Sequence, residues 1–465
     1  MTNVVLFTVD DMNGDTPGCF GGHPEATPTI DAFAAQGRRF TRGHVTIAVC
    51  QPSRSVMMTG RYPHRSGAMG FMPIADGVPV LTDVLGEAGY RCGIIGKVTH
   101  VAPVERMGWH LAVDQEELGE GRDPSRYAAV VGAFVADAVQ AGRPFFLMAN
   151  AHDPHRPFHA SDQEADHFSP QQLDTIPEPS HVFGASEWPV PGFLPDLPEI
   201  RREVAEYLSS SRRADDVFAA VLAELEAAGV ADDTLVIFLS DNGMAFPFAK
   251  TNCYLQSTRT PWIVRWPGRV PAGTVDDRHF VEAIDLAPTI LDAVGLGVPD
   301  GVDGRSHLAL LDGDTQAGRD RIVTVFHEAA AAAWLRHHGD DPSPAQFEMR
   351  SLQDARWGYI WNAWADGTKQ FFNESQSGRT WAAMADAAID DRAVAARTRF
   401  FQYRQPEELY DLADDPDALC NLIDADEHAA VRAELRHHLL QWMRRTDDFL
   451  LDRFATEVIG VGRNQ

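Results

Sequence analysis

A cysteine and an arginine lie close together near the start of the chain, in a window that reads as a turn leading into a helix. From residue 50 the sequence is Cys-Gln-Pro-Ser-Arg-Ser-Val-Met-Met-Thr-Gly-Arg. In a helix that begins there, Arg54 lies one turn from Cys50, where its guanidinium can orient a reactive group. Taken alone, the window favours a plain buried cysteine in a proline-containing turn, so a chemical role needs support from the rest of the chain.

Oxygen-bearing side chains follow two apolar runs. Asp10 and Asp11 come directly after a run that begins at Val4, and Asp241 and Asn242 follow a similar run later in the chain. Acidic pairs at strand ends are ordinary caps and turn residues. Together, however, the two clusters offer hard oxygen ligands suited to calcium, which accepts about six to eight oxygens at about 2.3–2.6 Å. They favour such a cation over a soft-metal site.

The apolar runs predict a scaffold that brings these clusters together. Val4–Val9, Phe145–Met148 and Leu235–Leu239 are apolar on both faces, which is typical of parallel strands in a sheet covered by helices. The second run leads to Asn150 and His152. Helical stretches lie between the strands, at Asp31–Gln36, Leu81–Ala88, Tyr127–Ala141 and Glu199–Ala228, the last stopped by Gly229. This alternation predicts a doubly wound α/β fold with helices on both faces and its functional residues at the carboxyl ends of the strands.

The chain changes character after about residue 320. An alanine-rich stretch at 329–333 and a polar loop at 337–343 precede aromatic, strand-like sequence at Trp357–Trp364. Ala429–Met443 has the apolar spacing of a helix. We therefore expect a catalytic domain over residues 1–345 and a smaller C-terminal α+β subdomain over residues 346–465.

Charge and composition limit the class of function. The chain has 67 Asp and Glu against 40 Lys and Arg, a net charge of −27 that repels nucleic acid and acidic membranes. Its longest apolar runs are far shorter than the roughly 20 residues of a membrane-spanning helix. Strand-like sequence begins at Val4 and leaves no room for a signal peptide, so we expect a cytoplasmic protein. The five scattered cysteines predict neither a disulfide framework nor a zinc site.

The window from Cys50 to Gly60 matches the pattern Cys-x-Pro-Ser-Arg-x-x-x-(Leu/Met)-Thr-Gly, and in this the chain resembles the type I sulfatases of the alkaline phosphatase superfamily. In that family a formylglycine-generating enzyme oxidises the cysteine. The resemblance implies one calcium ion, held by Asp10, Asp11, Asp241, Asn242 and the formylglycine oxygen of residue 50. Asn242 argues against a two-zinc phosphatase or a phosphonate monoester hydrolase, because these typically place histidine there.

The transferred sulfuryl group is anionic, so the resemblance implies a cage of cations beside the nucleophile. Arg54, Lys97 and Lys250 match its positions, although an exposed loop charge is the commoner fate of a lysine. His152 matches the histidine near the leaving group. His100 matches a second histidine that assists the diol, although two residues separate it from Lys97 where relatives usually have one. In the hydrated aldehyde, one hydroxyl attacks sulfur while an acid protonates the leaving group, and the second hydroxyl, deprotonated by a histidine, expels sulfate.

Within the family, the chain is most similar to the sulfamidases (N-sulfoglucosamine sulfohydrolases) and their bacterial relatives over nearly its whole length. The similar stretches are Ala26–Asp31, Gly93–Lys97, Arg143–Arg156, Asp233–Asn252, Glu348–Ser351 and Glu408–Leu412. This implies hydrolysis of a small N-sulfated amino sugar or a related sulfamate. Three alternatives stay open: an O-sulfatase on aryl, alkyl or sugar sulfates, a phosphomonoester or phosphonate hydrolase, and a noncatalytic protein that binds calcium and an anion.

The same resemblance implies substrate contacts and partners. Glu328 and Arg350 lie where similar enzymes place sugar-contacting residues, and Asp153 and Arg156 are further candidates beside His152. For Glu328 and Arg350, a surface salt bridge is the plain alternative. The expected partners are a small sulfated substrate, the formylglycine-generating enzyme, and a second copy of the chain in a homodimer.

Overall fold

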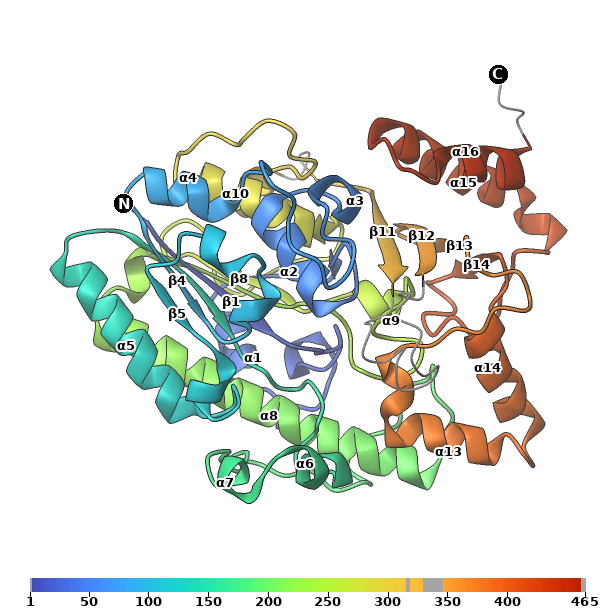
Figure 1. Cartoon of the computed structure of the whole chain (residues 1–465), viewed down its shortest axis with the longest axis horizontal. Coiled ribbons are helices and arrows are strands. Elements are labelled where there is room, and N and C mark those ends of the chain that lie inside the picture. The colour runs from blue at the N-terminus through green and yellow to red at the C-terminus, as the bar shows by residue number, and fades with distance from the viewer. Residues whose placement is uncertain (1, 315–317, 329–345, 461–465) are drawn as a thin grey trace.

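The computed structural model describes residues 2–314, 318–328 and 346–460, and an eight-stranded sheet forms its centre (Figure 1). The strand order is β5-β4-β6-β1-β7-β8-β2-β9. These strands are β1 (Asn3–Val9), β2 (Arg38–Phe40), β4 (Arg91–Ile95), β5 (Leu111–Val113), β6 (Phe145–Asn150), β7 (Thr234–Ser240), β8 (Trp262–Arg265) and β9 (Thr274–Asp276). β1 pairs in parallel with both β6 and β7, whereas β8 runs antiparallel to its neighbours β7 and β2. The predicted α/β sheet is confirmed.

Helices cover both faces of this sheet. Successive residues of a strand point to opposite faces, and in the central strands the residues on both faces are apolar. Val4 and Leu6 of β1 belong to the core on one face, and Val5 and Phe7 to the core on the other. The first face is covered by α2 (Cys50–Thr59), α4 (Leu81–Glu87) and α10 (Leu286–Ala293), and the second by α1 (Pro28–Ala35), α5 (Pro124–Gln140) and α8 (Pro198–Ala227). Each large apolar side chain buried here contributes on the order of 1.5–3 kcal/mol.

The helices expected between the strands are confirmed to within a few residues. α8 is the longest, at 30 residues, and runs past the edge of the sheet toward the C-terminal part of the chain (Figure 1). It begins with Pro198, whose missing N–H costs nothing in a first turn. Gly229 follows its end with φ +67°, a conformation that glycine adopts without strain.

A second, antiparallel sheet has the order β11-β12-β13-β14. Its strands are β11 (Arg321–Glu328), β12 (Gln346–Asp354), β13 (Trp357–Asn362) and β14 (Glu407–Asp411), and the helices around it are α13 (Arg379–Ala387), α14 (Arg392–Tyr403), α15 (Ala429–Arg445) and α16 (Leu451–Phe454). β11 pairs with β12, so this α+β sheet crosses the expected boundary at residue 345. The alanine-rich stretch and the polar loop expected at 329–343 lie outside the described residues.

One apolar core packs the C-terminal sheet against α8 and the segment that follows β7. Tyr207 of α8 and Phe246 belong to the same cluster as Trp361 of β13 and Phe401 of α14. The C-terminal part is therefore held against elements that flank the large sheet. The shorter elements are β3 (Gly43–His44), β10 (Val281–Glu282), α3 (Pro63–Ser66), α6 (Asp162–His167), α7 (Pro170–Leu173), α9 (Leu255–Thr258) and α11 (Leu308–Leu311). Among the described residues, no helix combines the length and the apolar character needed to cross a membrane.

Candidate active site

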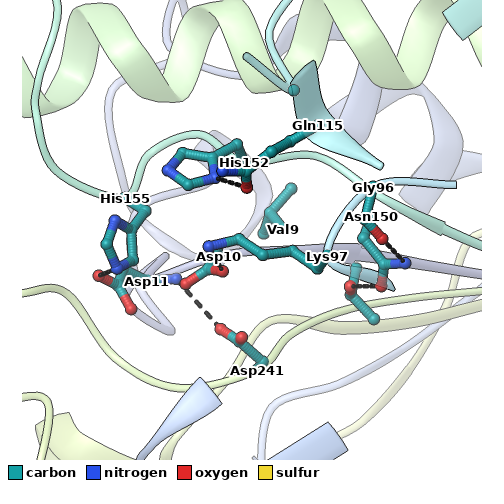
Figure 2. Close-up of polar contacts among 12 residues, drawn as sticks. Val9, Asp10, Asp11, Gly96, Lys97, Gln115, Asn150, His152, His155 and Asp241 are labelled. Carbon is teal, nitrogen blue, oxygen red and sulfur yellow. Dashed lines mark hydrogen bonds and ion pairs between the residues drawn. The ribbon is translucent and has the colours of Figure 1, made fainter. Parts of the chain in front are cut away.

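The carboxyl ends of three neighbouring strands bring the predicted polar clusters together. In the register of the sheet, Val9 of β1 lies beside Ser240 of β7, and Thr8 lies beside Asn150 of β6. The residues that follow β1 and β7 therefore emerge at the same edge. Figure 2 shows Asp10, Asp11 and Asp241 close together there, with the backbone nitrogen of Asp11 directed at Asp241 and its carboxylate beside His155.

Three buried carboxylates form the centre of the site, and none of them is exposed to solvent. Asp10 Oδ2 lies 2.7 Å from Lys97 Nζ, and Asp241 Oδ2 lies 2.7 Å from a terminal nitrogen of Arg54. Asp11 accepts a hydrogen bond of 2.7 Å from the amide nitrogen of Asn242, and its backbone N–H donates to Asp241 Oδ1 at 3.2 Å. The backbone at Asp11 has φ +67°, in the left-handed region that non-glycine residues seldom adopt.

The three carboxylates differ in acidity because they differ in their neighbours. Burial alone would raise the pKa of Asp10, but Lys97, His155 and Arg54 hold it well below its ordinary value. Burial raises the pKa of Asp11 well above its ordinary value in spite of the nearby lysine. Burial and the charge of Asp10 raise the pKa of Asp241 to about 6. A further positive charge would stabilise the ionised form of all three.

Two oxygens of the site have no hydrogen-bond partner among the described residues. They are Asp10 Oδ1 and Asn242 Oδ1, and both are buried. A buried oxygen without a partner costs free energy unless a ligand satisfies it. Ligand atoms of Asp10, Asp11 and His155 also lie within 4.8 Å of one another, a spacing that a single metal ion can bridge. The donors are mostly hard oxygens, so they fit a calcium ion.

Cys50 is the first residue of α2, whose N-terminus faces this cluster, and it is buried. Burial raises the pKa of its thiol to about 12, although Lys250 and Lys97 nearby favour the thiolate. At neutral pH the unmodified side chain is therefore a protonated thiol, which is a poor nucleophile. The helix N-terminus adds partial positive charge at this position.

Arg54 lies one helical turn after Cys50 in α2, as the sequence predicts. Its side chain contacts residues in or next to strands of the large sheet. One terminal nitrogen donates to Thr8 Oγ1 at 2.7 Å and to Asn150 Oδ1 at 2.5 Å. The other contacts Asp241 at 2.7 Å and Asp10 at 3.3 Å. Arg54 thus ties together the ends of β1, β6 and β7 and neutralises the carboxylates.

The two lysines expected to bind sulfate are both buried at the site. Lys97 follows β4 with φ +52°, and Figure 2 shows its side chain extended toward Asp10. Lys250 Nζ lies 2.8 Å from Asp11 Oδ1 and 2.7 Å from Glu374 Oε1. Burial would lower the pKa of Lys250, but Asp11 and Glu374 raise it well above its ordinary value, so the ammonium stays charged. Glu374 was not predicted as a site residue from the sequence. It begins the 3-10 helix Glu374–Ser377 in the C-terminal part of the chain.

His152 and His155 stand side by side, with ring centroids 4.9 Å apart. His152 Nδ1 donates to Gln115 Oε1 at 3.0 Å, as Figure 2 shows, which leaves Nε2 free to exchange a proton in the neutral ring. Burial and the charges of Lys97 and Arg122 lower the pKa of His152 well below its ordinary value. Gln115 is a contact that the sequence did not predict.

His155 is a second site residue that sequence reasoning missed. Its Nδ1 donates to the carbonyl of Arg156 at 2.6 Å, and its Nε2 lies 3.8 Å from Asp11 and 3.7 Å from Glu374. Burial and the charge of Lys250 lower its pKa to about 3, so the ring is neutral and its Nε2 lone pair faces the carboxylates. His155 lies three residues after His152 in the same window, which was the one signal available.

His100 follows Lys97 in a short 3-10 helix and is half-buried. Its Nδ1 has no hydrogen-bond partner among the described residues. Burial and the charge of Lys97 lower its pKa to about 2, so the ring is neutral at neutral pH. Its ring centroid lies 6.1 Å from that of Phe71, a side chain that is 42% exposed.

Three of the four residues predicted to contact substrate form buried ion pairs. Asp153 binds two arginines, at 3.0 and 2.5 Å, and its side chain has no exposed surface. Arg156 pairs with Glu203, and Arg350 pairs with Asp448 at 2.6 Å with both side chains fully buried. These groups already have protein partners, and their predicted substrate contacts stay predictions. The two arginines that bind Asp153 are Arg122 and Arg213. Arg156 also donates to the backbone carbonyl of Ala245.

Glu328, the fourth expected contact, lies at the end of β11 and is partly exposed. Its side chain packs against Gly70, where a Cβ would come within 2.0 Å of its carboxylate. Burial and the charge of Glu348 raise its pKa above the ordinary value. This contact joins β11 to the loop after α3. The sugar contact of Glu328 stays a prediction.

A family model described as Sulfatase matches residues 2–296. The chain is 30% identical over 469 residues to N-sulphoglucosamine sulphohydrolase of Homo sapiens, an alignment covering 96% of this chain and 90% of that protein. It is 22% identical over 430 residues to N-acetylglucosamine-6-O-sulfatase of Bacteroides thetaiotaomicron, covering 72% and 76%. The crystal structure of phosphonate monoester hydrolase of Agrobacterium radiobacter superposes with a TM-score of 0.69 at 19% identity, covering 96% of each chain. This structural likeness establishes the alkaline phosphatase-like fold.

Proposed function

Since this chain belongs to the sulfatase family and is a sulfuric ester hydrolase, we propose that it is a calcium-dependent sulfohydrolase that carries formylglycine at position 50. Its substrate in this proposal is a small N-sulfated amino sugar or a related sulfamate. One observation carries the proposal: Asp10, Asp11, Asp241 and Asn242 converge from two strand ends on a buried centre that also holds three cationic side chains.

The residues present fit a calcium ion. Asp10, Asp11, Asp241 and Asn242 would hold it, and the two unpartnered oxygens of Asp10 and Asn242 are open to such a contact. When bound, calcium supplies positive charge beside the sulfuryl oxygens. In its absence Lys97, Lys250 and Arg54 alone balance the carboxylates.

The surroundings of Cys50 suit an oxygen nucleophile better than a thiol. A protonated thiol with a pKa of about 12 is a weak nucleophile, and a buried position at a helix N-terminus suits an oxygen nucleophile that becomes negatively charged. Formylglycine at position 50 would supply, when hydrated, two hydroxyl groups, one as the nucleophile toward sulfur and the other as the group that a base deprotonates to release sulfate. The modification requires a formylglycine-generating enzyme as a partner during maturation.

Arg54, Lys97 and Lys250 provide the electrostatic part of catalysis. Their side chains are at most 2% exposed, so their charges act where water does not screen them. The charge that develops on sulfuryl and leaving-group oxygens or nitrogen is stabilised by groups that are already in place. No reorganisation of solvent is then needed during the reaction.

His152 is the proposed general acid, and His100 is the proposed base for the diol. Before substrate binds, burial and Lys97 keep the His152 ring neutral. The anionic sulfuryl group adds the negative charge that favours its protonated form. Gln115 fixes Nδ1, so proton transfer takes place at Nε2. This arrangement suits an amine leaving group, because an amide anion cannot depart without a proton.

The sulfamate proposal draws on the 30% identity to the human sulphohydrolase over nearly the whole of both chains. An O-sulfatase is the second candidate, favoured by the likeness to the bacterial 6-O-sulfatase. The test is a panel of N-sulfoglucosamine, nitrophenyl sulfate and nitrophenyl phosphate with enzyme fully converted at residue 50. Release of sulfate from N-sulfoglucosamine at a kcat/KM well above those of the other two supports the proposal. Hydrolysis of O-sulfates alone would reject the sulfamate substrate, and preference for the phosphate would reject the sulfatase chemistry.

A further inference from the structure

Glu374 is a carboxylate beside a site built to bind an anion. It is the one member of the described cluster that comes from the C-terminal part of the chain, and its side chain is 19% exposed while those of Lys250 and Asp11 are fully buried. Its Oε1 lies 2.7 Å from Lys250 Nζ and 3.7 Å from His155 Nε2. A negative charge there repels a sulfuryl group, so its presence calls for a compensating role.

The protein holds Glu374 firmly in this position. The turn before it is closed by Asn373, whose side-chain oxygen accepts from the Ser375 N–H at 2.8 Å. At the other end of the turn, the buried carboxylate of Glu203 accepts from two backbone N–H groups at the start of α13, at 2.9 and 2.7 Å. Arg156 pairs with the same carboxylate. The ion pair between Arg156 and Glu203 therefore anchors the turn that carries Glu374.

Lys250 is placed between two carboxylates of different kinds. Asp11 is a proposed metal ligand, at 2.8 Å from the ammonium, and Glu374 lies at a similar distance on the side of the C-terminal part. A divalent cation at Asp11 repels an ammonium on the same carboxylate. A buried lysine without any acidic partner is costly, so Lys250 can leave Asp11 only if another carboxylate retains it. Glu374 is that carboxylate.

We infer that Glu374 is a positioning residue that draws the Lys250 ammonium off Asp11, thereby opening Asp11 to the metal and holding the ammonium toward the sulfuryl group. This inference rests on the proposed calcium site. The C-terminal part of the chain then contributes to calcium affinity, and it does so through Lys250.

Calcium titration calorimetry of the full-length protein, with calcium chloride as the probe, tests the inference without any turnover. Glu374→Gln keeps the shape of the side chain but removes its charge, so Lys250 pairs with Asp11 alone and calcium binds roughly ten-fold more weakly. Glu199→Gln is the matched control, because Glu199 also pairs near the start of α13, with Arg379, but does not reach the site. Its calcium affinity should equal that of the wild type.

The double variant Lys250→Ala, Glu374→Gln separates positioning from general damage. If Glu374 acts through Lys250, the double variant binds calcium as tightly as Lys250→Ala alone. Equal affinity of Glu374→Gln and wild type, or a double variant as weak as Glu374→Gln, would overturn the inference and leave the calcium site standing. Failure of the wild-type protein itself to bind calcium would overturn the proposed metal site together with the inference.

Discussion

Replacing Asp241 by asparagine separates the two tasks that we assign to this residue, neutralising Arg54 and binding calcium. The side chain keeps its shape, but the buried contact of 2.7 Å to Arg54 loses its negative charge. Losing this contact destabilises the fold, but the pKa of Asp241 is raised to about 6, so its negative charge is itself unfavourable in the folded protein without calcium. Arg54 also retains Asp10 at 3.3 Å and its hydrogen bonds to Thr8 and Asn150. The two effects oppose each other, and we expect little change in the free energy of unfolding without calcium.

Calcium should then widen the difference between Asp241→Asn and the wild type. At a concentration of 100 times its Kd, calcium adds about 2.7 kcal/mol to the wild-type free energy of unfolding. A variant that binds ten-fold more weakly gains only about 1.4 kcal/mol at the same concentration. Urea unfolding of both proteins, with calcium and with a chelator, measures the two quantities separately.

Asp448→Asn is the matched control for this experiment. Asp448 also forms a fully buried ion pair, with Arg350 at 2.6 Å, and among the described residues it makes no hydrogen bond or ion pair with the site. Asp448→Asn should lose about 3–5 kcal/mol in the free energy of unfolding without calcium and keep the full gain from calcium. Equal gains from calcium in Asp241→Asn and wild type would refute Asp241 as a ligand, whatever the loss of stability without calcium.

Two further predictions concern proton transfer and pH. His152→Ala should reduce hydrolysis of N-sulfoglucosamine by about 10²–10⁴-fold and that of nitrophenyl sulfate much less, since a phenolate leaves without a proton; equal losses in kcat would show that His152 binds sulfate instead. Burial raises the pKa of Glu282 from 4.5 to about 7, so the folded protein binds the extra proton between these values and its stability falls as pH rises through them. Glu282→Gln should remove a decline of up to about 3 kcal/mol across that range in urea unfolding; an unchanged pH slope would contradict the assignment.

Three strands of the large sheet, β1, β6 and β7, could be predicted because each is a continuous apolar run, a pattern that a sheet covered on both faces requires. The residues at their ends followed directly, since Asp10, Asp11, Asp241 and Asn242 are adjacent to those runs. Cys50, Arg54, Lys97 and Lys250 were found by their motifs. This part of the site could therefore be predicted from short stretches of sequence.

The remaining parts depend on long-range packing. Glu374 meets Lys250 across 124 positions of sequence, and nothing in its own segment marks it as a site residue. Arg156 and Arg350 have the charge expected of sugar contacts, but the sequence does not reveal the buried partners Glu203 and Asp448 that saturate them. The boundary expected at residue 345 falls between β11 and β12, which pair in one sheet. This pairing could not be predicted, because antiparallel pairing across a long connection leaves no local signal in the sequence.

The central claim is that residue 50 acts as formylglycine, and turnover measured against its extent of conversion tests this most directly. Preparations made with and without a formylglycine-generating enzyme give a series of converted fractions, each determined by mass spectrometry of the peptide that contains residue 50. With calcium present, kcat per chain for the release of sulfate should rise in proportion to the converted fraction and extrapolate to zero for the unmodified thiol. Full activity in a preparation whose residue 50 is entirely cysteine would contradict the account.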